Sequence, residues 1–297
     1  MRRSVIAGVD GSARGNAAAD WAAREALRRG VVLRVVYTAS QAEDRAEDFW
    51  PYRHVPMPER SVTELTARHP ELEIESVRLS GPGAPSLPEF AGTAELLVVG
   101  TRGSGGFAGL ALGSTALAVA QQASTPVVLV PSGLACGQQR PRPDKVSLGV
   151  DAREPDDAAC DFAFDAAQQR GVRLHAIHAW ALPSAAAPWM PYPPPSRDRA
   201  EWENHEVQLL ADALRPWRDK YPAVPVLPDV VLHTPAQALV SASRWAELIV
   251  VGRRGNTLGP AVDALVRHTK CPVAVVPSDA ARGGHALWSD TAQASWS

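Results

Sequence analysis

Short apolar runs alternate along the first half of the chain with segments of helix-forming composition. Residues 96–99 are apolar at every position, which is typical of a strand covered on both faces of a parallel sheet. The pattern predicts strands at Ser4–Val9, Val31–Thr38, Leu72–Leu79, Leu96–Gly100 and Val127–Val130, and helices at Ala17–Arg29, Glu59–Arg68, Ser86–Phe90 and Ser114–Gln122. This order of elements favours an α/β fold with a doubly wound parallel sheet and right-handed crossovers.

The second half of the chain repeats the first. Lys145–Asp151 echoes Arg3–Asp10 with the two aspartates 141 residues apart, and Leu248–Gly255 matches Leu96–Gly103 at an offset of 152. Such repetition predicts two tandem copies of one domain rather than a single large sheet. We expect the domains at residues 1–132 and 144–278, a linker at 133–143 and a flexible tail at 279–297.

Two local patterns in the second copy lead to further predictions. Asp198–Tyr221 has the composition of a long helix, with an interruption expected at Pro216 because proline removes a backbone donor. His175 and His178 lie three residues apart on an expected strand, so their side chains face opposite sides of the sheet and cannot chelate one metal ion together. We interpret both histidines as packing residues.

Composition narrows the possible partners and compartment. The chain has 297 residues, 45% of them hydrophobic, and a net charge of −2 with mixed signs, so neither nucleic acid nor a membrane surface is an expected partner. Its three cysteines are isolated, without a C-x-x-C motif, and no apolar run reaches 18 residues. These features favour a globular protein of the reducing cytoplasm, with neither export nor membrane insertion expected.

Candidate chemistry gathers after the first and fourth strands of the first copy. Asp10, Gly11 and Ser12 follow the first strand, and a glycine-dense loop follows the fourth and leads to Ser114 and Thr115 at the start of a helix. Glycines allow a ligand to approach the backbone, and a helix N-terminus favours an anion. If the two strands are neighbours, both segments face one crevice at the carboxyl edge of the sheet. The sequence therefore predicts a phosphate-binding loop.

Several enzyme and binding classes lack their signature. The chain has no G-x-x-x-x-G-K-[ST] motif of a P-loop NTPase. Residues 103–108 match a weak dinucleotide pattern, but the next strand ends without the acidic residue that binds a ribose, which disfavours a nicotinamide site. Neither H-E-x-x-H nor G-x-S-x-G occurs, and no cysteine and histidine cluster has zinc spacing.

The glycine spacing carries a family resemblance. Gly100, Gly103, Gly113 and Ser114 fit G-x2-G-x9-G-[ST], and with Asp10 at a strand end the chain resembles a tandem universal stress protein whose first domain belongs to the ATP-binding branch. The resemblance implies two five-stranded domains of the adenine nucleotide alpha-hydrolase-like fold, and ATP as ligand, with Mg2+ left open. The site residues it implies are Asp10, Gly11, Ser12, Thr38, Val99, Gly100, Arg102, Gly103, Gly113, Ser114 and Thr115. Asp10 and the backbone near Thr38 are expected at the adenine or ribose, and the glycines, Arg102, Ser114 and Thr115 at the ribose and phosphates.

The second copy departs from this motif. Only three residues separate Gly255 from Gly259, and Gly259-Pro260-Ala261 stands where the first copy has Gly113-Ser114-Thr115, although Asp151 is retained. Because both hydroxyls and one N–H donor are missing, we expect this domain to bind nucleotide weakly or not at all.

Three functions stay open from the sequence. The leading hypothesis is a stress-response regulatory module controlled by ATP in the first domain, without an assigned catalytic residue. The alternatives are a slow ATPase or phosphotransferase using the same pocket, and a nucleotide-free scaffold. The segments PVVLVP and PVAVVP resemble strand edges that pair two domains antiparallel, so we expect pairing within the chain, and a homodimer stays open.

Overall fold

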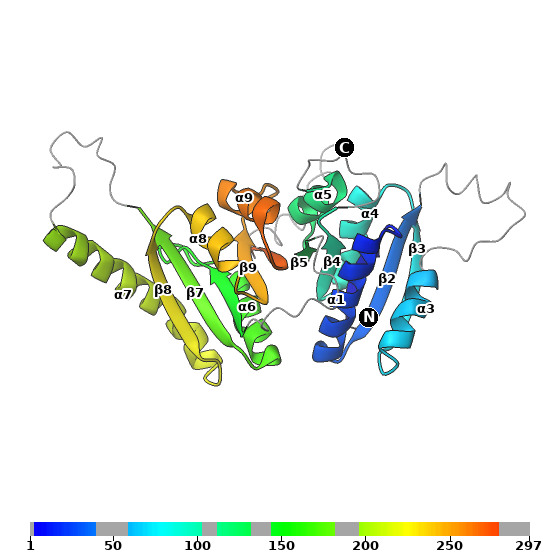
Figure 1. Cartoon of the computed structure of the whole chain (residues 1–297), viewed down its shortest axis with the longest axis horizontal. Helices are drawn as coiled ribbons and strands as arrows, with labels where there is room; N and C mark the ends of the chain where they lie inside the picture. The colour runs from blue at the N-terminus through cyan, green and yellow to red at the C-terminus, as the bar shows by residue number, and fades with distance from the viewer. Residues whose placement is uncertain (1–2, 40–58, 103–111, 132–143, 182–195, 279–297) are drawn as a thin grey trace, which may run out of the picture.

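Ten strands form one continuous sheet across the whole chain (Figure 1). The computed structural model describes residues 3–39, 59–102, 112–131, 144–181 and 196–278. The strand order is β3-β2-β1-β4-β5-β10-β9-β6-β7-β8, so each half of the chain supplies five neighbouring strands. Strands within each half pair in parallel, whereas β5 and β10 pair antiparallel at the centre. The expected pair of doubly wound domains is confirmed.

The first domain follows the predicted order closely. Its elements are β1 (Ser4–Val9), α1 (Ala13–Arg29), β2 (Val32–Ala39), α3 (Glu59–Arg68), β3 (Ile74–Ser80), α4 (Gly83–Phe90), a short 3-10 turn (Ala91–Thr93), β4 (Leu96–Gly100), α5 (Ser114–Gln122) and β5 (Val127–Val130). Helix α1 begins four residues earlier than predicted because Ser12 caps it, with its Oγ accepting a hydrogen bond from the Gly15 N–H at 3.0 Å.

The second domain repeats this order. Its elements are β6 (Lys145–Gly149), α6 (Asp157–Arg170), β7 (Arg173–Trp180), α7 (Ser196–Lys220), β8 (Val226–Leu232), α8 (Pro235–Ala242), β9 (Leu248–Arg253), α9 (Pro260–His268) and β10 (Val273–Pro277). The expected interruption of α7 at Pro216 is wrong, since the helix continues through it. Leu210 and Leu214 are fully buried and Trp217 packs on the same core, so packing on both sides of the proline outweighs the lost backbone hydrogen bond.

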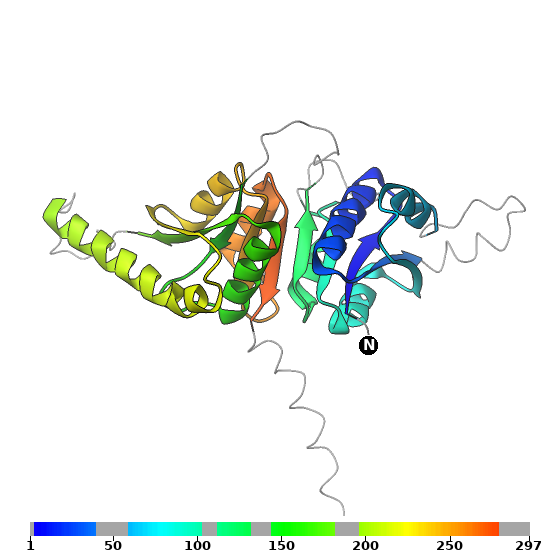
Figure 2. The same cartoon turned by 90° about the horizontal axis from the view of Figure 1, so that it is seen from below.

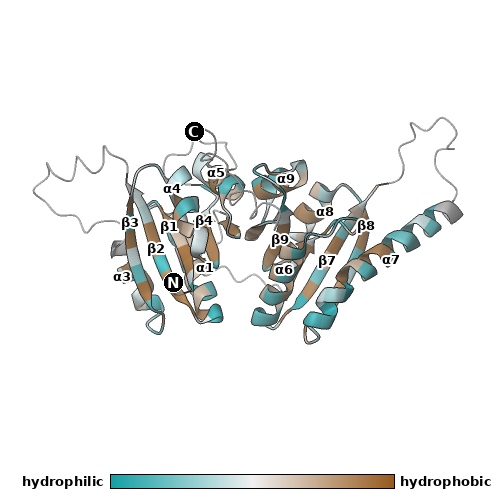
Figure 3. Cartoon of the chain, turned by 180° about the vertical axis from the view of Figure 1, so that it is seen from behind, coloured by the Kyte–Doolittle hydropathy of each residue, from teal (hydrophilic) through white to brown (hydrophobic). Residues whose placement is uncertain are grey.

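Helices cover the sheet on both sides. Helices α1, α6 and α7 pack on one face and α4, α5, α8 and α9 on the other, with a buried apolar cluster under each set. Brown apolar residues concentrate along the strands, and the helices carry more teal polar positions (Figure 3). Within the described residues, no helix is both long and apolar enough to cross a membrane.

The two domains meet at the β5–β10 pair (Figure 2). Val127 lies opposite Val275 and Leu129 opposite Val273, all of them buried, so the predicted antiparallel pairing within the chain is confirmed. These two strand edges therefore already occupy each other. The pairing leaves β3 and β8 as the outer strands of the sheet.

Ionic contacts reinforce this junction on the α1 and α6 side. The carboxylate of Glu25 on α1 accepts a hydrogen bond from Arg170 on α6 at 2.5 Å, with each side chain 1% exposed. The guanidinium of Arg29 lies 5.4 Å from the Phe162 ring centroid, and that of Arg170 lies 5.9 Å from the Trp21 ring centroid. These two cation–π contacts relate residues 141 positions apart, so the junction has approximate two-fold symmetry.

Candidate functional site

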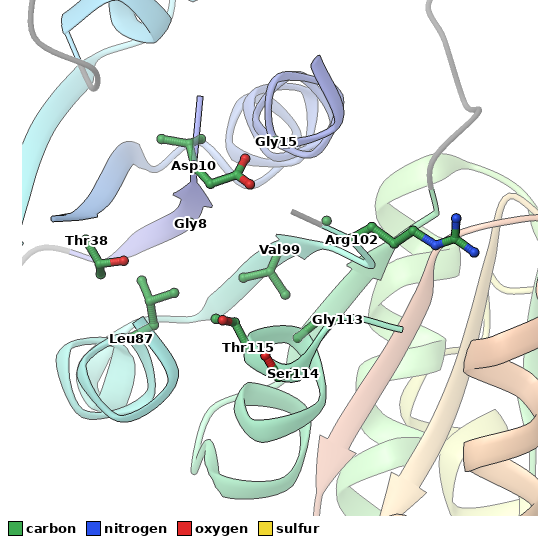
Figure 4. A pocket seen from close by; sticks show the side chains of 13 residues that line it. Gly8, Asp10, Gly15, Thr38, Leu87, Val99, Arg102, Gly113, Ser114 and Thr115 are labelled. Atoms are coloured by element: carbon green, nitrogen blue, oxygen red, sulfur yellow. The ribbon is translucent and has the colours of Figure 1, made fainter. Parts of the chain in front are cut away.

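A cavity of about 310 Å3 opens at the carboxyl ends of the first-domain strands (Figure 4). Strand β1 lies between β2 and β4, so the segments that follow β1 and β4 face one crevice, as the sequence predicted. The described residues that line it are Gly8, Val9, Asp10, Gly15, Thr38, Leu87, Val99, Gly100, Arg102, Gly113, Ser114, Thr115 and Ala116. The cavity therefore draws on β1, β2, β4, α4 and the first turns of α1 and α5.

An apolar floor closes the cavity toward the sheet. Gly8 on β1 lets Leu87 of α4 and Val99 of β4 come close, since a Cβ at position 8 would lie 3.1 Å from a methyl group of each. That distance is tight enough that a larger residue would displace its neighbours. The floor offers van der Waals contact and no charge, which suits a flat apolar ring more than a phosphate.

Asp10 is held in place by the start of α1. Its carboxylate accepts hydrogen bonds from the backbone N–H of Ser12 at 3.0 Å and from the Ser12 hydroxyl at 2.6 Å. A Cβ at position 15 would lie 2.7 Å from Asp10 Oδ1, closer than real Cβ contacts come. Glycine at position 15 therefore gives the carboxylate its room, and Ser12 serves to orient Asp10 and cap the helix.

The opposite wall is the N-terminus of α5. Gly113 precedes the helix in an extended conformation and, within the described residues, no side chain caps this end. The first backbone hydrogen bond of the helix runs from the Leu117 N–H to the Gly113 carbonyl at 3.0 Å, so the N–H groups of Ser114, Thr115 and Ala116 precede the repeating pattern. Three such groups and the helix dipole make this wall an anion-binding surface.

The structure brings most of the predicted site residues together. The cavity is lined by eight of them: Asp10, Thr38, Val99, Gly100, Arg102, Gly113, Ser114 and Thr115. Gly11 and Ser12 are not among the lining residues, and Gly103 lies outside the described residues. The guanidinium of Arg102 points away from Asp10 and Thr38 in Figure 4, so its predicted phosphate contact needs a side-chain rotation.

Sequence reasoning missed part of the lining. Gly8, Gly15 and Leu87 were not predicted, although a glycine in the first turn of a helix costs stability and is a signal that something lies close to it. Leu87 comes from a helix whose approach to β1 depends on packing, so its spacing in the sequence carried no signal.

The corresponding end of the second domain is occupied by its own acidic and basic side chains. Asp156 stands 141 residues after Gly15, and its carboxylate Oδ2 lies 2.9 Å from the position of a Cβ on Gly252, the counterpart of Gly100. Arg254, the counterpart of Arg102, pairs with the Glu154 carboxylate and donates to the Glu154 carbonyl at 2.7 Å. A carboxylate thus lies where the first domain offers space.

Two buried histidines complete this region of the second domain. His178 lies 3.0 Å from the Glu206 carboxylate, which also pairs with Arg153, and His175 lies 2.9 Å from Asp229. They occupy opposite faces of β7, as predicted, and both are buried with hydrogen-bond partners. Among the residues that the structure describes, no group of three histidine, cysteine or carboxylate side chains is arranged to hold a metal ion.

Comparisons with known proteins agree with the fold and the repeat. The sequence model of the universal stress protein family matches residues 1–131 and again 143–277. Universal stress protein Rv1996 of Mycobacterium tuberculosis (strain ATCC 25618 / H37Rv) is 31% identical over 321 aligned residues, covering 93% of this chain and 96% of that protein. Universal stress protein Rv2005c of the same strain is 30% identical over 298 residues, covering 92% and 97%.

A solved structure shows the same fold over nearly the whole chain. A universal stress protein from Archaeoglobus fulgidus DSM 4304 superposes with a TM-score of 0.60 at 15% identity, covering 93% of this chain and 96% of that one. The family match in both halves, the two full-length relatives and this likeness in fold lead to one conclusion. The chain belongs to the universal stress protein family and carries two of its domains in tandem.

Proposed function

We propose that the first domain binds ATP and that the protein acts as a nucleotide-controlled regulatory module in the response to stress. The observation that carries the proposal is the uncapped N-terminus of α5 facing a cavity whose other wall is the Asp10 carboxylate. A polyanion suits the first wall because it accepts N–H hydrogen bonds and is stabilised by the helix dipole. A ribose suits the second because its hydroxyls donate to a carboxylate.

The cavity supports this division of roles. Its volume of about 310 Å3 falls at the lower end of the usual range for small-molecule sites. In the proposal, adenine lies over Gly8, Leu87 and Val99 near Thr38, while the phosphates reach Gly113, Ser114 and Thr115. Asp10 alone among the described lining residues bears a carboxylate, so an accompanying Mg2+ would be held chiefly by phosphate oxygens and water.

The other two hypotheses have less support. A scaffold working through free strand edges is disfavoured because β5 and β10 already pair with each other. Hydrolysis is a separate question from binding, and ADP production at stoichiometric protein concentration tests it.

Thermal unfolding of the full chain with and without Mg-ATP tests the proposal. A ligand present at 100 times its dissociation constant adds about 2.7 kcal/mol of stability, so the wild-type midpoint should rise clearly. Gly113→Asp should abolish the rise, because a carboxylate at the N-cap takes the N–H groups that the phosphates need.

The matched control is Gly259→Asp, which makes the same change at the N-cap of α9 in the second domain. It should keep the wild-type response to ATP. A wild-type midpoint that ATP does not move, or one whose rise both variants retain, would contradict ATP binding at α5.

A further inference from the structure

One arginine of the second domain reaches into the first. Arg253 is the last residue of β9 and is 3% exposed. Its Nη1 donates to the Gln121 carbonyl at 2.6 Å and its Nη2 to the Ala123 carbonyl at 2.5 Å, both at the C-terminus of α5. A third hydrogen bond, to the Gly255 carbonyl, fixes the guanidinium to its own domain. Arg253 therefore joins β9 to the helix whose other end faces the cavity.

The contact supplies what α5 lacks. The last carbonyls of a helix have no partner within it, and a cation there is favourable to the helix dipole. Helix α5 has no basic residue in its own last turn, whereas α9 carries Arg267 and His268 in its last turn. Thr101, the counterpart of Arg253 in the first domain, is a short neutral side chain. The capping cation is thus supplied in one direction only, from the second domain to α5.

Helix α5 is short enough for its two ends to act together. Nine residues span about 13 Å at 1.5 Å per residue. Its N-terminal end is tied to β4 by the hydrogen bond from the Gly113 N–H to the Thr101 carbonyl at 2.8 Å. Fixing the C-terminal end then sets the direction in which the N–H groups of Ser114, Thr115 and Ala116 point, and a buried positive charge behind the helix adds to the potential that a phosphate meets.

We propose that Arg253 is a positioning residue through which the second domain raises the affinity of the first-domain site for phosphate groups. This inference rests on the proposed function, since it names the regulation of the same site. The second domain, which has lost its own phosphate-binding helix start, contributes to binding by holding α5. By reciprocity, a nucleotide bound at α5 strengthens the hold of Arg253 and tightens the junction between the domains.

The experiment compares ATP with adenosine on the full-length protein, using calorimetric titration of the wild type and Arg253→Met. Methionine keeps much of the volume of the buried side chain and removes the charge and the fork of donors. We expect ATP to bind about five- to tenfold more weakly, at the lower end of typical coupling between sites. Adenosine, which has no phosphate to meet α5, should keep its affinity within about twofold, so the ratio of the two affinities reports the positioning role.

Two further variants complete the design. Arg254→Met is the matched control, because the neighbouring arginine pairs with Glu154 inside the second domain, and it should leave both affinities unchanged. Arg253→Lys keeps the charge but loses the two-pronged contact, so ATP affinity should fall between the wild type and Arg253→Met. Arg253→Lys also tests the positioning role if Arg253→Met fails to fold.

The outcomes separate the inference from the proposed function. Unchanged ATP affinity in Arg253→Met, or an equal loss for ATP and adenosine, would overturn the positioning role while leaving ATP binding in place. A wild type that binds neither ligand would refute the proposed function first, and the inference would fall with it.

Discussion

The two domains share one framework and differ at one end of it. Both have a glycine on the first strand against which a leucine and a valine pack: Gly8 with Leu87 and Val99, and Gly149 with Leu239 and Val251. Above this shared floor, the first domain has Gly15 and an open cavity, whereas the second has Asp156 and its carboxylate. The core of the fold is therefore common to both while the ligand end differs, because the core is close-packed and the strand ends are not.

The second difference lies at the start of the last helix. Helix α5 begins with Ser114 and Thr115 after Gly113, and α9 begins with Pro260 and Ala261 after Gly259. Proline at the first helical position is structurally favourable, because the missing N–H has no partner in the helix. The second domain thus keeps a well-formed helix while losing a donor that a phosphate needs, so helix stability and phosphate binding have different requirements at this position.

The largest expected effect comes from placing the second-domain residue in the first domain. Gly15→Asp should bring a carboxylate into the cavity beside Asp10, where two like charges and lost space both oppose a nucleotide. ATP affinity should fall by roughly a hundredfold, which is about 2.7 kcal/mol. Equilibrium titration measures it.

The reverse change, Asp156→Gly, is the paired variant. It removes the carboxylate over Gly252 and the N-cap bond to the Ala159 N–H at 3.0 Å, and should cost about 1 kcal/mol of stability. It should not create a second ATP site, because α9 still begins with proline. A second site appearing in Asp156→Gly would mean that the carboxylate alone separates the domains.

Next in size is the loss of the buried charge at the junction. Burial by itself raises the pKa of Glu25, but the positive charges of Arg170, Arg29 and Arg28 outweigh it and hold the pKa below its ordinary value. Glu25→Gln should lower the free energy of unfolding by about 2 kcal/mol at pH 7, since it leaves buried arginines without their carboxylate. Chemical denaturation of both proteins measures the difference.

The pH dependence of that difference follows from the sign of the shift. A carboxylate with a depressed folded pKa stabilises the protein above its unfolded pKa and loses that contribution as the pH falls through the folded pKa. The gap between wild type and Glu25→Gln should therefore be full at pH 7 and shrink as the pH falls below about 4.5. A constant gap down to pH 3 would show that the charge of Glu25 is not what stabilises the junction.

A smaller effect is expected from exchanging the helix starts. Ser114→Pro with Thr115→Ala gives α5 the beginning of α9, removing one N–H and two hydroxyls without disturbing the helix. ATP affinity should fall about tenfold, or about 1.4 kcal/mol, while the unfolding midpoint without ligand stays near that of the wild type. A large drop in that midpoint would instead indicate that the change had damaged the fold.

The smallest expected effect concerns the second-domain thiols. Burial raises the pKa of Cys160 and of Cys271 to about 12 each. In Cys136→Ser, both should resist alkylation at pH 8 and react on unfolding, as followed by mass spectrometry. Saturating ATP should leave this native-state protection unchanged, because the proposed site lies in the other domain. Rapid labelling of native protein would contradict the burial of these side chains.

The sequence predicted the strands and most helices because their signals are local. Unbroken apolar runs such as Leu96–Val99 and the repeated glycine after each run indicated the order of elements, and the internal repeat indicated the number of domains. Pro216 misled the prediction for α7, since a local rule about proline cannot include the burial of Leu210 and Leu214 on the same helix. Ser12 likewise emerged as a cap and an orienting group, which no spacing revealed.

By itself, the sequence determined that two copies of one α/β domain follow each other and that only the first retains a complete glycine and hydroxyl motif at Gly113 and Ser114. Tertiary structure alone decided that Gly15 clears the space for Asp10, that Asp156 fills the matching space, and that Arg253 crosses the junction to α5. The physical reason is range: periodicity and glycine spacing act between near neighbours in the chain. A buried guanidinium instead finds its carbonyls about 130 residues away, through the pairing of β5 with β10.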